Sequence, residues 1–560
     1  MERTSQQIEG KEIISAINEI ERSRGISKDV LIPALETALS AAYRKHYSGL
    51  HANVKVTIDS QSGELRVASL KSVVEEVADV EVGGVAGNLG ALADASGKKE
   101  VGEAVGRSVE LPPGHLPARV LEGVGLHELV LAPGDLALLF DLRIDADEAD
   151  LVLLNTCSVR DKAEQKVYDF LGRVAVRKRL RPELLVGVCG CVAQQEGEEL
   201  LRRSAAVDFV LGTGRIELLP AVVRRVLEEG DRPVEVGFDK DEVAYTPGAV
   251  ARTVAHRASI TVIEGCNKNC TFCVVPTTRG RERSRRLADV VEESERLVDS
   301  GVIEIELLGQ TVNAYTDPVS GESFASLLRA VSKIRGLRRL RFVTSHPKNF
   351  GEDLIAAMAE SDVVCPSLHL PFQSGSDGVL RRMKRQYNRA EYLDLVGRLR
   401  RAIPGLAMST DIIVGFPGET DEDFEATLSL LSEVGFGSVY CFTYSPRPLT
   451  AAARWEQDVP VPVAQDRLAK LNDHQQAIQL RAHEAMVGEI LEVLVEGMDK
   501  KGRRVSGRSP HNHLVNIDGI PGTPPGTFVR AVVERGLGNS LLARPLRIEE
   551  PSSAGTTVAP

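Results

Sequence analysis

Cysteine is scarce in this chain. The sequence has eight cysteines in 560 residues, and none of them precedes Cys157. This scarcity excludes a disulfide scaffold, which needs a high density of cysteines in a short secreted chain. Five of the eight cysteines lie in two tight local groups. That grouping favours metal ligation in a reducing compartment, so we expect a cytoplasmic protein.

Long apolar runs and an excess of basic residues are missing too. No uninterrupted apolar stretch reaches the ~18–20 residues that a membrane span needs. The start from Met1 to Lys11 is polar, without the pattern of a signal or an anchor, so we expect no membrane partner. The net charge of -11 argues against generic nucleic-acid binding, and any RNA contact must come from local basic patches. A hydrophobic fraction of 43% in 560 residues is ordinary for a soluble protein of several domains.

Three of the cysteines lie on one short stretch. Cys266, Cys270 and Cys273 have the spacing Cys-x3-Cys-x2-Cys. Soft thiolates suit iron–sulfur chemistry, and three of them can hold three irons of a cubane cluster. The fourth iron then has no protein ligand, so it can bind a substrate or a cofactor. We therefore interpret these three cysteines as the metal ligands and the catalytic residues.

A zinc site is the alternative for this stretch. Zinc in a structural site needs a closed tetrahedral set of Cys and His ligands. The nearest histidine, His256, lies upstream of an expected strand. The three-cysteine spacing instead resembles that of the radical S-adenosylmethionine (SAM) enzymes, in which the open iron binds SAM.

Short apolar runs alternate with helical patterns between residues 258 and 445, and strands alternating with helices predict a parallel sheet. The expected strands are Ser259–Ile263, Ile303–Leu308, Leu340–Thr344, Leu368–Phe372, Ala407–Val414 and Val439–Tyr444. The helices expected between them include Leu287–Asp299, Phe324–Ile334 and Glu391–Arg401. These units predict a partial (β/α)6 barrel within a core domain of residues 250–482. The three-cysteine stretch follows its first strand, where the loops of such barrels carry function.

A smaller parallel α/β domain is expected before this core, over residues 146–235. Its strands end in cysteines, because Cys157 follows one of them and Cys189 and Cys191 close the next. Loops at the carboxyl ends of parallel strands are where such folds place their sites. Toward the other end, short strands around turns over residues 485–548 predict a small β-barrel, a type that often binds RNA. Residues 549–560 are expected to be a disordered tail.

The N-terminal part, residues 1–78, reads as an α+β module with two helices and a hairpin. Val54, Val56 and Ile58 alternate, and Leu65 and Val67 alternate back after a polar turn. The stretch from Leu35 to Tyr43 resembles the N-terminal domain of the transcription factor NusA, which implies RNA polymerase as a partner. Residues 79–145 are rich in glycine and lack an aromatic residue until Phe140, so we interpret them as a linker or atypical segment.

From Asn155 onward the chain resembles the MiaB-type radical SAM methylthiotransferases, and the C-terminal barrel is similar to the TRAM domain of that family. The matching motifs occur in family order. They are Asn155–Arg160, Gly190–Gly197, the stretch from Gly265 to Gly280, Thr344–Pro347, His369–Ser376, Asp411–Thr420 and Tyr444–Pro448.

The resemblance implies two [4Fe–4S] clusters and SAM as cofactors. The first cluster, on the three cysteines described above, binds SAM, and reduction of SAM gives a 5′-deoxyadenosyl radical. The radical abstracts hydrogen from C2 of N6-dimethylallyladenosine at position 37 of tRNA. The second cluster, in the smaller α/β domain, supplies sulfur that a second SAM methylates. The resemblance also implies tRNA as a partner, and an electron donor such as a flavodoxin or ferredoxin.

The sequence departs from this family in its second cluster. The family uses three cysteines there, and Cys157 and Cys191 match only the second and the third. No cysteine stands where the first belongs, which indicates a fusion or frame disruption between the NusA-like start and the MiaB-like body. Cys189 is an alternative third ligand, although a strand-end cysteine without a ligand role is the simpler interpretation. We expect the second cluster to be labile or absent.

Two loops of the core are candidates for SAM binding. Gly415, Gly418 and Glu419 follow a strand and offer backbone donors and a carboxylate. Gln373 and Ser374 follow another strand and are placed to meet a polar cofactor or the tRNA base. The glycines have a simpler interpretation, which is that they only shape a turn.

Three basic runs are candidates for RNA contact, because phosphate neutralisation by Lys and Arg gives salt-dependent binding. They are Arg279, Arg281, Arg283, Arg285 and Arg286, then Arg381, Arg382, Lys384 and Arg385, and finally Lys500, Lys501, Arg503 and Arg504. A solvated helix face is the alternative for the second run.

Two other functions stay open from the sequence. A methylthiotransferase with the same chemistry can act on threonylcarbamoyladenosine or on a ribosomal protein. A transcription-associated binding protein is a different class, in which the NusA-like module dominates and the enzyme is inactive.

Overall fold

The computed structural model describes residues 54–58, 65–69, 120–121, 149–157, 161–238, 254–499 and 501–549. The chain forms two compact units, Met1–Ser108 and Val109–Pro560. In the first unit, β1 (Val54–Ile58) and β2 (Leu65–Ser69) pair antiparallel, with Val56 opposite Val67. The predicted hairpin is therefore confirmed, whereas the two helices predicted before it and the C-terminal tail lie outside the described residues.

The second unit begins with a parallel five-stranded sheet in the order β3-β4-β5-β6-β7. Its strands are β3 (Val120–Leu121), β4 (Leu151–Thr156), β5 (Leu185–Gly190), β6 (Phe209–Leu211) and β7 (Val234–Glu235). The central strands are apolar on both faces because helices cover both, which is the usual cause of continuous apolar runs in parallel sheets. β3 lies inside the segment that the sequence indicated as a linker, where no long apolar run announces it.

Over the described ranges, four helices belong to this sheet. They are α4 (Asp161–Leu180), α5 (Cys191–Glu196), α6 (Glu198–Arg203) and α7 (Leu219–Glu229). Val167, Leu171 and Val174 of α4 recur at helical spacing and are buried against the sheet. Gly197, with a φ of 51°, separates α5 from α6.

The six strands predicted for the core are all present. They are β8 (Arg257–Glu264), β10 (Glu304–Gly309), β11 (Arg339–Phe342), β12 (Ser367–His369), β13 (Ala407–Val414) and β14 (Ser438–Thr443). They form two sheets, β11-β10-β8-β9 and β12-β13-β14, in which β9 (Arg283–Ser284) is a short antiparallel addition. An isolated parallel bridge between Leu340 and Val364 links β11 to the segment before β12.

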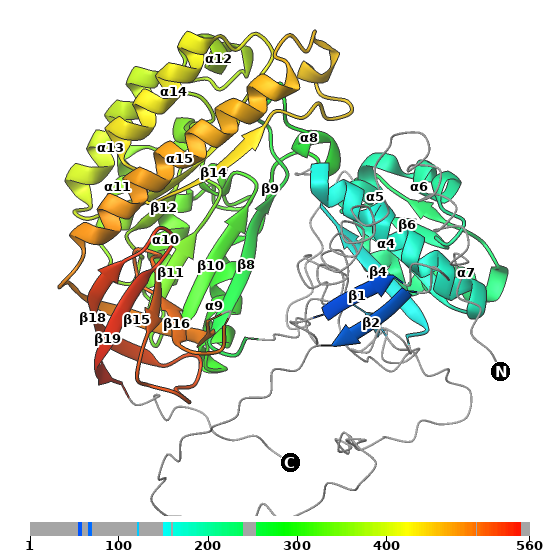
Figure 1. The fold of residues 1–560 in the computed structure, drawn as a ribbon, viewed down its shortest axis with the longest axis horizontal. Helices are drawn as coiled ribbons and strands as arrows, with labels where there is room; N and C mark the ends of the chain where they lie inside the picture. Colours follow the sequence, from blue (N-terminus) through cyan, green and yellow to red (C-terminus); the bar gives the residue numbers. More distant parts are fainter. Residues whose placement is uncertain are drawn as a thin grey trace, which may run out of the picture. The chain divides into compact units, whose positions relative to one another are not determined.

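Helices alternate with these strands, as Figure 1 shows. The longer ones are α9 (Leu287–Asp299), α10 (Phe324–Ser332), α11 (Glu352–Ala359), α13 (Arg389–Ala402), α14 (Asp421–Val434) and α15 (Val461–Ala485). Two short helices, α8 (Val275–Thr278) and α12 (Asp377–Arg382), follow the cysteine loop and β12. Asn388 and Thr420 begin α13 and α14 with reciprocal capping boxes, which satisfy backbone donors that a helix start leaves open.

The C-terminal strands form a closed barrel in the order β15-β16-β17-β19-β18, which confirms the predicted small β-barrel. The strands are β15 (Ile490–Met498), β16 (Val505–Arg508), β17 (Leu514–Ile517), β18 (Phe528–Gly536) and β19 (Leu541–Ile548). Inward residues such as Val493, Val515 and Val529 alternate with outward ones and are fully buried. β16 is short and partly polar and β19 contains Pro545, so neither has a clean alternating pattern.

Buried arginines of β11 join the C-terminal barrel to the core. Arg339 donates to the backbone carbonyl of Arg508 at 2.8 Å and to the carboxylate of Glu492 at 3.0 Å. Arg341 donates to the carbonyl of Ser509 at 2.8 Å, and its guanidinium pairs with Glu304 at 3.2 Å. β11 is therefore hydrogen-bonded to the C-terminal barrel through its arginine side chains.

Three histidines lie at the same junction. The rings of His511 and His513 stack at 5.9 Å between centroids, and His483 of α15 meets His513 edge-on at 5.9 Å. Burial, together with the neighbouring histidines, lowers the pKa of His513 to about 4.

Among the described residues, no helix is long and apolar enough to cross a membrane.

Candidate active site

The cysteine stretch begins where β8 ends, as the sequence predicted. Gly265 has a φ of 75°, and a Cβ placed there would lie 2.1 Å from the carbonyl oxygen of Arg281. Its backbone N–H donates to the side chain of Gln310 at 2.7 Å, and the N–H of Cys266 donates to the carbonyl of Gly280 at 3.1 Å. Only glycine combines this left-handed conformation with so close an approach.

Each of the three sulfurs receives a hydrogen bond from a nitrogen donor. The backbone N–H of Lys268 donates to Cys266 Sγ at 3.4 Å, and the guanidinium of Arg385 donates to Cys270 Sγ at 3.4 Å. The backbone N–H of Val275 donates to Cys273. Thr311 adds a hydroxyl 3.2 Å from Cys266 Sγ. Hydrogen bonds of this kind orient thiolate ligands and tune an iron–sulfur cluster, so these residues fit one.

Cys266 is buried, while Cys270 and Cys273 are half-buried. Burial raises the pKa of Cys266, while hydrogen bonds from Thr311 and Lys268 act in the opposite direction. Burial also raises the pKa of Cys273, to about 12, against the hydrogen bond from Val275. A positive metal centre reverses such a penalty because a coordinating thiol is deprotonated outright.

Over the described part of the chain, no three His, Cys, Asp or Glu side chains surround one point closely enough to hold a single metal ion. A closed zinc site needs such a set. A cubane cluster spreads its ligands, with one thiolate on each of three irons.

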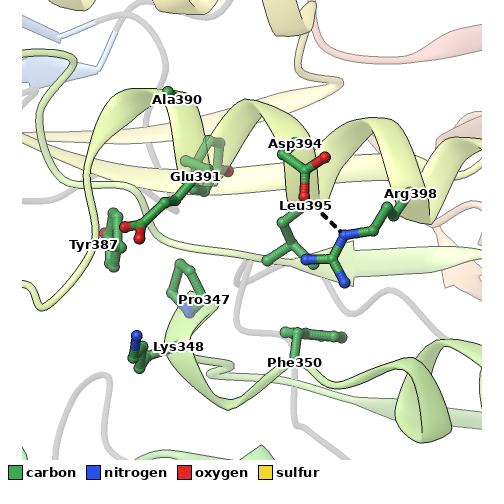
Figure 2. A pocket seen from close by; sticks show the side chains of 10 residues that line it. Pro347, Lys348, Phe350, Tyr387, Ala390, Glu391, Asp394, Leu395 and Arg398 are labelled. Carbon is green, nitrogen blue, oxygen red and sulfur yellow. Dashed lines mark hydrogen bonds and ion pairs between the residues drawn. The ribbon is translucent and has the colours of Figure 1, made fainter.

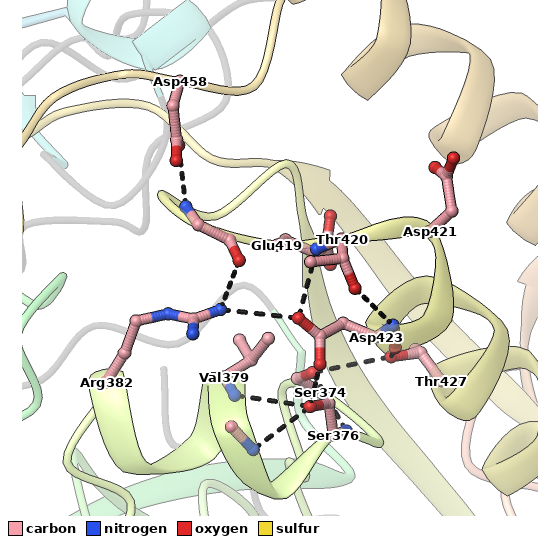
Figure 3. Close-up of polar contacts among 12 residues, drawn as sticks. Ser374, Ser376, Val379, Arg382, Glu419, Thr420, Asp421, Asp423, Thr427 and Asp458 are labelled. Carbon is pink, nitrogen blue, oxygen red and sulfur yellow. Dashed lines mark hydrogen bonds and ion pairs between the residues drawn. The ribbon is translucent and has the colours of Figure 1, made fainter.

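The loops after β12 and β13 are tied together by ionic and hydrogen-bonded contacts (Figure 3). Arg382 donates to the carbonyl of Gly418 at 2.7 Å and lies 3.5 Å from the carboxylate of Asp423. Asp423 in turn accepts from the hydroxyl of Ser376 and from the backbone N–H of Thr420. The two candidate SAM loops are thus connected to each other and form one rim.

The same rim reaches the cysteine loop. Thr271, between Cys270 and Cys273, donates its hydroxyl to the carbonyl of Arg382 at 2.9 Å and its backbone N–H to the carbonyl of Met383 at 3.2 Å. The backbone at the end of α12 therefore fixes the cysteine loop relative to both candidate SAM loops.

The predicted SAM contacts lie on this rim. Gly415 and Gly418 have φ values of 71° and 79°, so both shape turns. Glu419 is buried, and one carboxylate oxygen accepts from the N–H of Gly415 at 2.6 Å and from Arg467 at 2.8 Å. Its other oxygen, Oε1, is buried and has no partner among the residues that the structure describes. A polar ligand would satisfy that oxygen, since an unpaired buried acceptor costs about 1–3 kcal/mol.

Gln373 and Ser374 differ from each other. Gln373 has a left-handed φ of 70°, and its side-chain Oε1 is buried without a partner among the described residues. Ser374 is fully buried, and its hydroxyl lies 3.5 Å from that of Thr427. Gln373 therefore has an acceptor to offer a ligand, while Ser374 has a structural partner. The roles of all five predicted SAM residues stay predictions.

Comparison with known proteins gives four family matches. The Radical SAM superfamily matches residues 260–431, the uncharacterized protein family UPF0004 residues 139–212, the NusA N-terminal domain residues 12–113 and the TRAM domain residues 484–546. The NusA match extends past residue 78, where the sequence indicated the end of that module.

The chain is also similar to curated proteins over most of their length. It is 47% identical over 399 residues to the tRNA-2-methylthio-N(6)-dimethylallyladenosine synthase of Geotalea uraniireducens, covering 71% of this chain and 90% of that protein. The chain belongs to the tRNA-2-methylthio-N(6)-dimethylallyladenosine synthase family. The synthase of Geobacter metallireducens is 47% identical over 406 residues, with 71% of this chain and 90% of that protein covered.

Among solved structures, the radical SAM methyltransferase TsrM from Kitasatospora setae has a TM-score of 0.45 and 16% identity, covering 60% of this chain and 74% of that chain. As a synthase of this family, the chain is a radical SAM enzyme that uses SAM and [4Fe–4S] chemistry.

The cysteines predicted for the second metal centre lie at the carboxyl ends of β4 and β5. β4 and β5 pair in parallel with Thr156 opposite Gly190, so Cys157 and Cys191 leave the same sheet edge side by side. Cys191 Sγ accepts from Arg279 Nε at 3.3 Å, which links this edge to the end of α8. Cys189 is fully buried among core residues, and burial raises its pKa to about 12. This environment matches the interpretation of Cys189 as a core residue without a ligand role.

The basic runs are partly used inside the fold. Arg285 is buried and pairs with Glu293 at 2.7 Å, Arg283 pairs with Glu264, and Arg385 is buried at Cys270. These arginines are therefore removed from the predicted RNA surface. The exposed members are Arg281, Arg286, Arg381, Lys384, Lys501 and Arg503. Lys500 lies outside the described residues.

A cavity of about 470 Å³ lies between the segment after β11 and α13 (Figure 2). Pro347 and Lys348 line one wall, and Glu391 and Arg398 of α13 line the other. Arg398 is engaged by Asp394 at 2.9 Å. None of the predicted site residues lines this cavity.

Sequence reasoning missed Arg385 and Thr311 as neighbours of the cysteines. Arg385 was counted in a basic run because charge alone does not reveal burial. Their signal is positional, since Thr311 lies just after the second core strand and Arg385 just after α12.

Proposed function

We propose that this chain methylthiolates tRNA at C2 of N6-dimethylallyladenosine in position 37, with SAM as both radical source and methyl donor. The observation that carries the proposal is the loop of Cys266, Cys270 and Cys273, in which every sulfur accepts a hydrogen bond from a nitrogen donor. The two synthases described above carry this activity in their names. We infer further that the six core strands form one partial (β/α)6 barrel around this site.

The three cysteines would hold a [4Fe–4S] cluster, which supplies the electron for reductive cleavage of SAM. Gly415, Gly418 and Glu419, with Gln373 and Ser374, would hold SAM over the strand ends. The unpaired acceptors of Gln373 and Glu419 suit the hydroxyl and amino donors of such a ligand. A ring C–H bond has no useful acidity, so the protein's part is to orient the base and exclude water.

The second centre limits this activity. Cys157 and Cys191 provide two of the three ligands that the family uses, so we expect a labile or absent second cluster and weak methylthiolation. Reconstituted protein should then hold about four irons per chain, all lost when Cys266 is replaced by alanine. About eight irons, falling to about four in Cys157→Ala, would contradict this expectation.

Mass analysis of tRNA nucleosides tests the reaction. Cells that lack their own synthase and express this chain should accumulate the 2-methylthio form of dimethylallyladenosine at a reduced level, and the Cys266→Ala variant should give none. A methylthio product only on threonylcarbamoyladenosine or on a ribosomal protein would replace the proposed substrate.

Two partners belong to this proposal. A flavodoxin or ferredoxin would donate the electron, and reduction assays with each would identify it. RNA polymerase would bind the NusA-like part, which is supported by the family match over residues 12–113. A polymerase pull-down with and without residues 1–78 tests this, and equal recovery of polymerase would exclude it. We place the enzyme in the cytoplasm, where tRNA is modified.

A further inference from the structure

Arg385 is a buried cation beside a predicted cluster ligand. Only 5% of it is exposed. Its guanidinium donates to Cys270 Sγ at 3.4 Å, to the carbonyl of Pro371 at 3.1 Å and to the hydroxyl of Tyr387 at 3.0 Å. One planar side chain thus joins the cysteine loop to the segment after β12, a task suited to the rigid fork of arginine.

The backbone around Arg385 is strained. Lys384 and Gln386, its two neighbours, both have a φ of 57°. Left-handed conformations cost energy for residues other than glycine, and they persist where the surroundings fix them, commonly at active sites. Such a residue on each side of Arg385 indicates that the contacts of the Arg385 side chain hold this segment in place.

No carboxylate of the described residues pairs with Arg385. In the described part of the chain, its side-chain contacts are a thiol, a phenol and a carbonyl. A buried cation is costly unless an anion lies close to it. A cluster bound through thiolates carries negative charge, and Cys270 is the contact through which that charge would meet Arg385.

We propose that Arg385 is a positioning residue of the radical SAM centre that orients Cys270 and raises the reduction potential of the cluster. This inference rests on the proposed function, because it requires the three cysteines to hold the cluster. Reduction adds an electron, and a nearby positive charge with an N–H donor on sulfur stabilises the more negative state. Arg385 thereby makes the centre easier to reduce by a cellular donor.

Redox titration followed by electron paramagnetic resonance tests this role. The full chain, carrying Cys157→Ala and Cys191→Ala so that only one cluster remains, is compared with the same chain carrying Arg385→Gln or Arg385→Lys. We expect Arg385→Gln to lower the equilibrium constant for reduction about tenfold, which is about 59 mV for one electron. Arg385→Lys keeps the charge, so its shift should be less than half as large.

Arg401→Gln serves as a control for net charge, because Arg401 is exposed on α13. It should leave the potential unchanged. Equal potentials in wild type and Arg385→Gln, or equal shifts in the Gln and Lys variants, would overturn the proposal. If Arg385→Gln binds no iron, it has no cluster potential to compare, and the Arg385→Lys variant becomes the test. It supports the proposal by keeping its iron with a near-normal potential and overturns it by losing the iron. A parent chain without any cluster would instead refute the assignment of the three cysteines.

Discussion

At the scale of single residues, the cysteine loop depends on one glycine. We predict that Gly265→Ala strongly reduces cluster assembly for two reasons. A Cβ there would lie 2.1 Å from the carbonyl oxygen of Arg281, and the left-handed backbone of Gly265 disfavours any side chain. Iron content after anaerobic reconstitution measures the effect, and we expect at least a severalfold loss.

Gly230 provides the matched control for this substitution. Its φ of 66° is also left-handed, but a Cβ there meets nothing within 4 Å. Gly230→Ala should therefore cost only about 1 kcal/mol of backbone strain and keep its iron. Normal iron content in Gly265→Ala would show that the loop tolerates a shifted backbone.

The buried pair of Arg467 and Glu419 is a second residue-scale feature. Their side chains are 7% and 1% exposed and lie 2.8 Å apart. We predict that Arg467→Met destabilises the core by about 3–5 kcal/mol, because it leaves a carboxylate buried without its cation. Urea denaturation monitored by circular dichroism measures the loss.

An exposed pair calibrates that result. Arg398 pairs with Glu352, which is 75% exposed, so Arg398→Met should cost about 0–1 kcal/mol. Similar losses in the two variants would mean that Glu419 takes a proton and tolerates the loss of Arg467. Burial does favour that proton, since it raises the pKa of Glu419 against the hydrogen bond from Gly415 and the charge of Arg467.

At the scale of elements, the histidines between α15 and the C-terminal barrel make stability depend on pH. The pKa of His513 is about 4 in the folded chain against an ordinary value of 6.5. The unfolded chain therefore binds more protons between these values. The contribution of His513 to the free energy of unfolding is therefore complete above pH 6.5 and falls as the pH drops toward 4.

We predict a loss of about 1–2 kcal/mol from His513 between pH 7 and pH 5, at 1.36 kcal/mol per pKa unit. The His513→Gln variant should show a shallower loss over this range, measured by thermal unfolding of the C-terminal barrel. Identical acid slopes in the two proteins would mean that His513 is solvated in the folded state.

The strands also show which parts of the fold could be predicted from the sequence. Strands β8, β10 and β13 were predictable because each is a distinct apolar or alternating run between turn residues. β3 and β16 were not, because strands of two and four residues depend on their neighbours in the sheet for stability. The cysteine loop was predictable from spacing alone. Arg385 and Thr311 were not, because they reach the loop through tertiary packing.

At the scale of the whole molecule, the junction between the core and the C-terminal barrel rests on Arg341. Its side chain is 9% exposed and pairs with Glu304, which is 5% exposed. We predict that Arg341→Met costs about 3–5 kcal/mol and weakens tRNA binding, while tRNA-independent SAM cleavage remains. Filter binding of tRNA and limited proteolysis of the junction measure these effects.

Arg338→Met is the control for this junction. Arg338 reaches Glu492 and Glu549 across the same junction, but its side chain is 45% exposed, so its loss should cost about 0–1 kcal/mol. Unchanged tRNA binding in Arg341→Met would show that the barrel grips RNA without a fixed orientation.

The placement of Arg339 and Arg341 has a consequence for what can be modified. Arg339 and Arg341 of β11 are hydrogen-bonded to the C-terminal barrel. The chain beyond the other end of β11 leads to His346. Burial, and then the charges of Arg385 and Lys268 near the cysteine loop, lower the pKa of His346. The four residues of β11 separate its two ends by roughly 10 Å. A tRNA held by the C-terminal barrel would have to span this separation to bring a base to the cysteine loop. We therefore expect a loose nucleoside, bound at one of the two places only, to be a poor substrate.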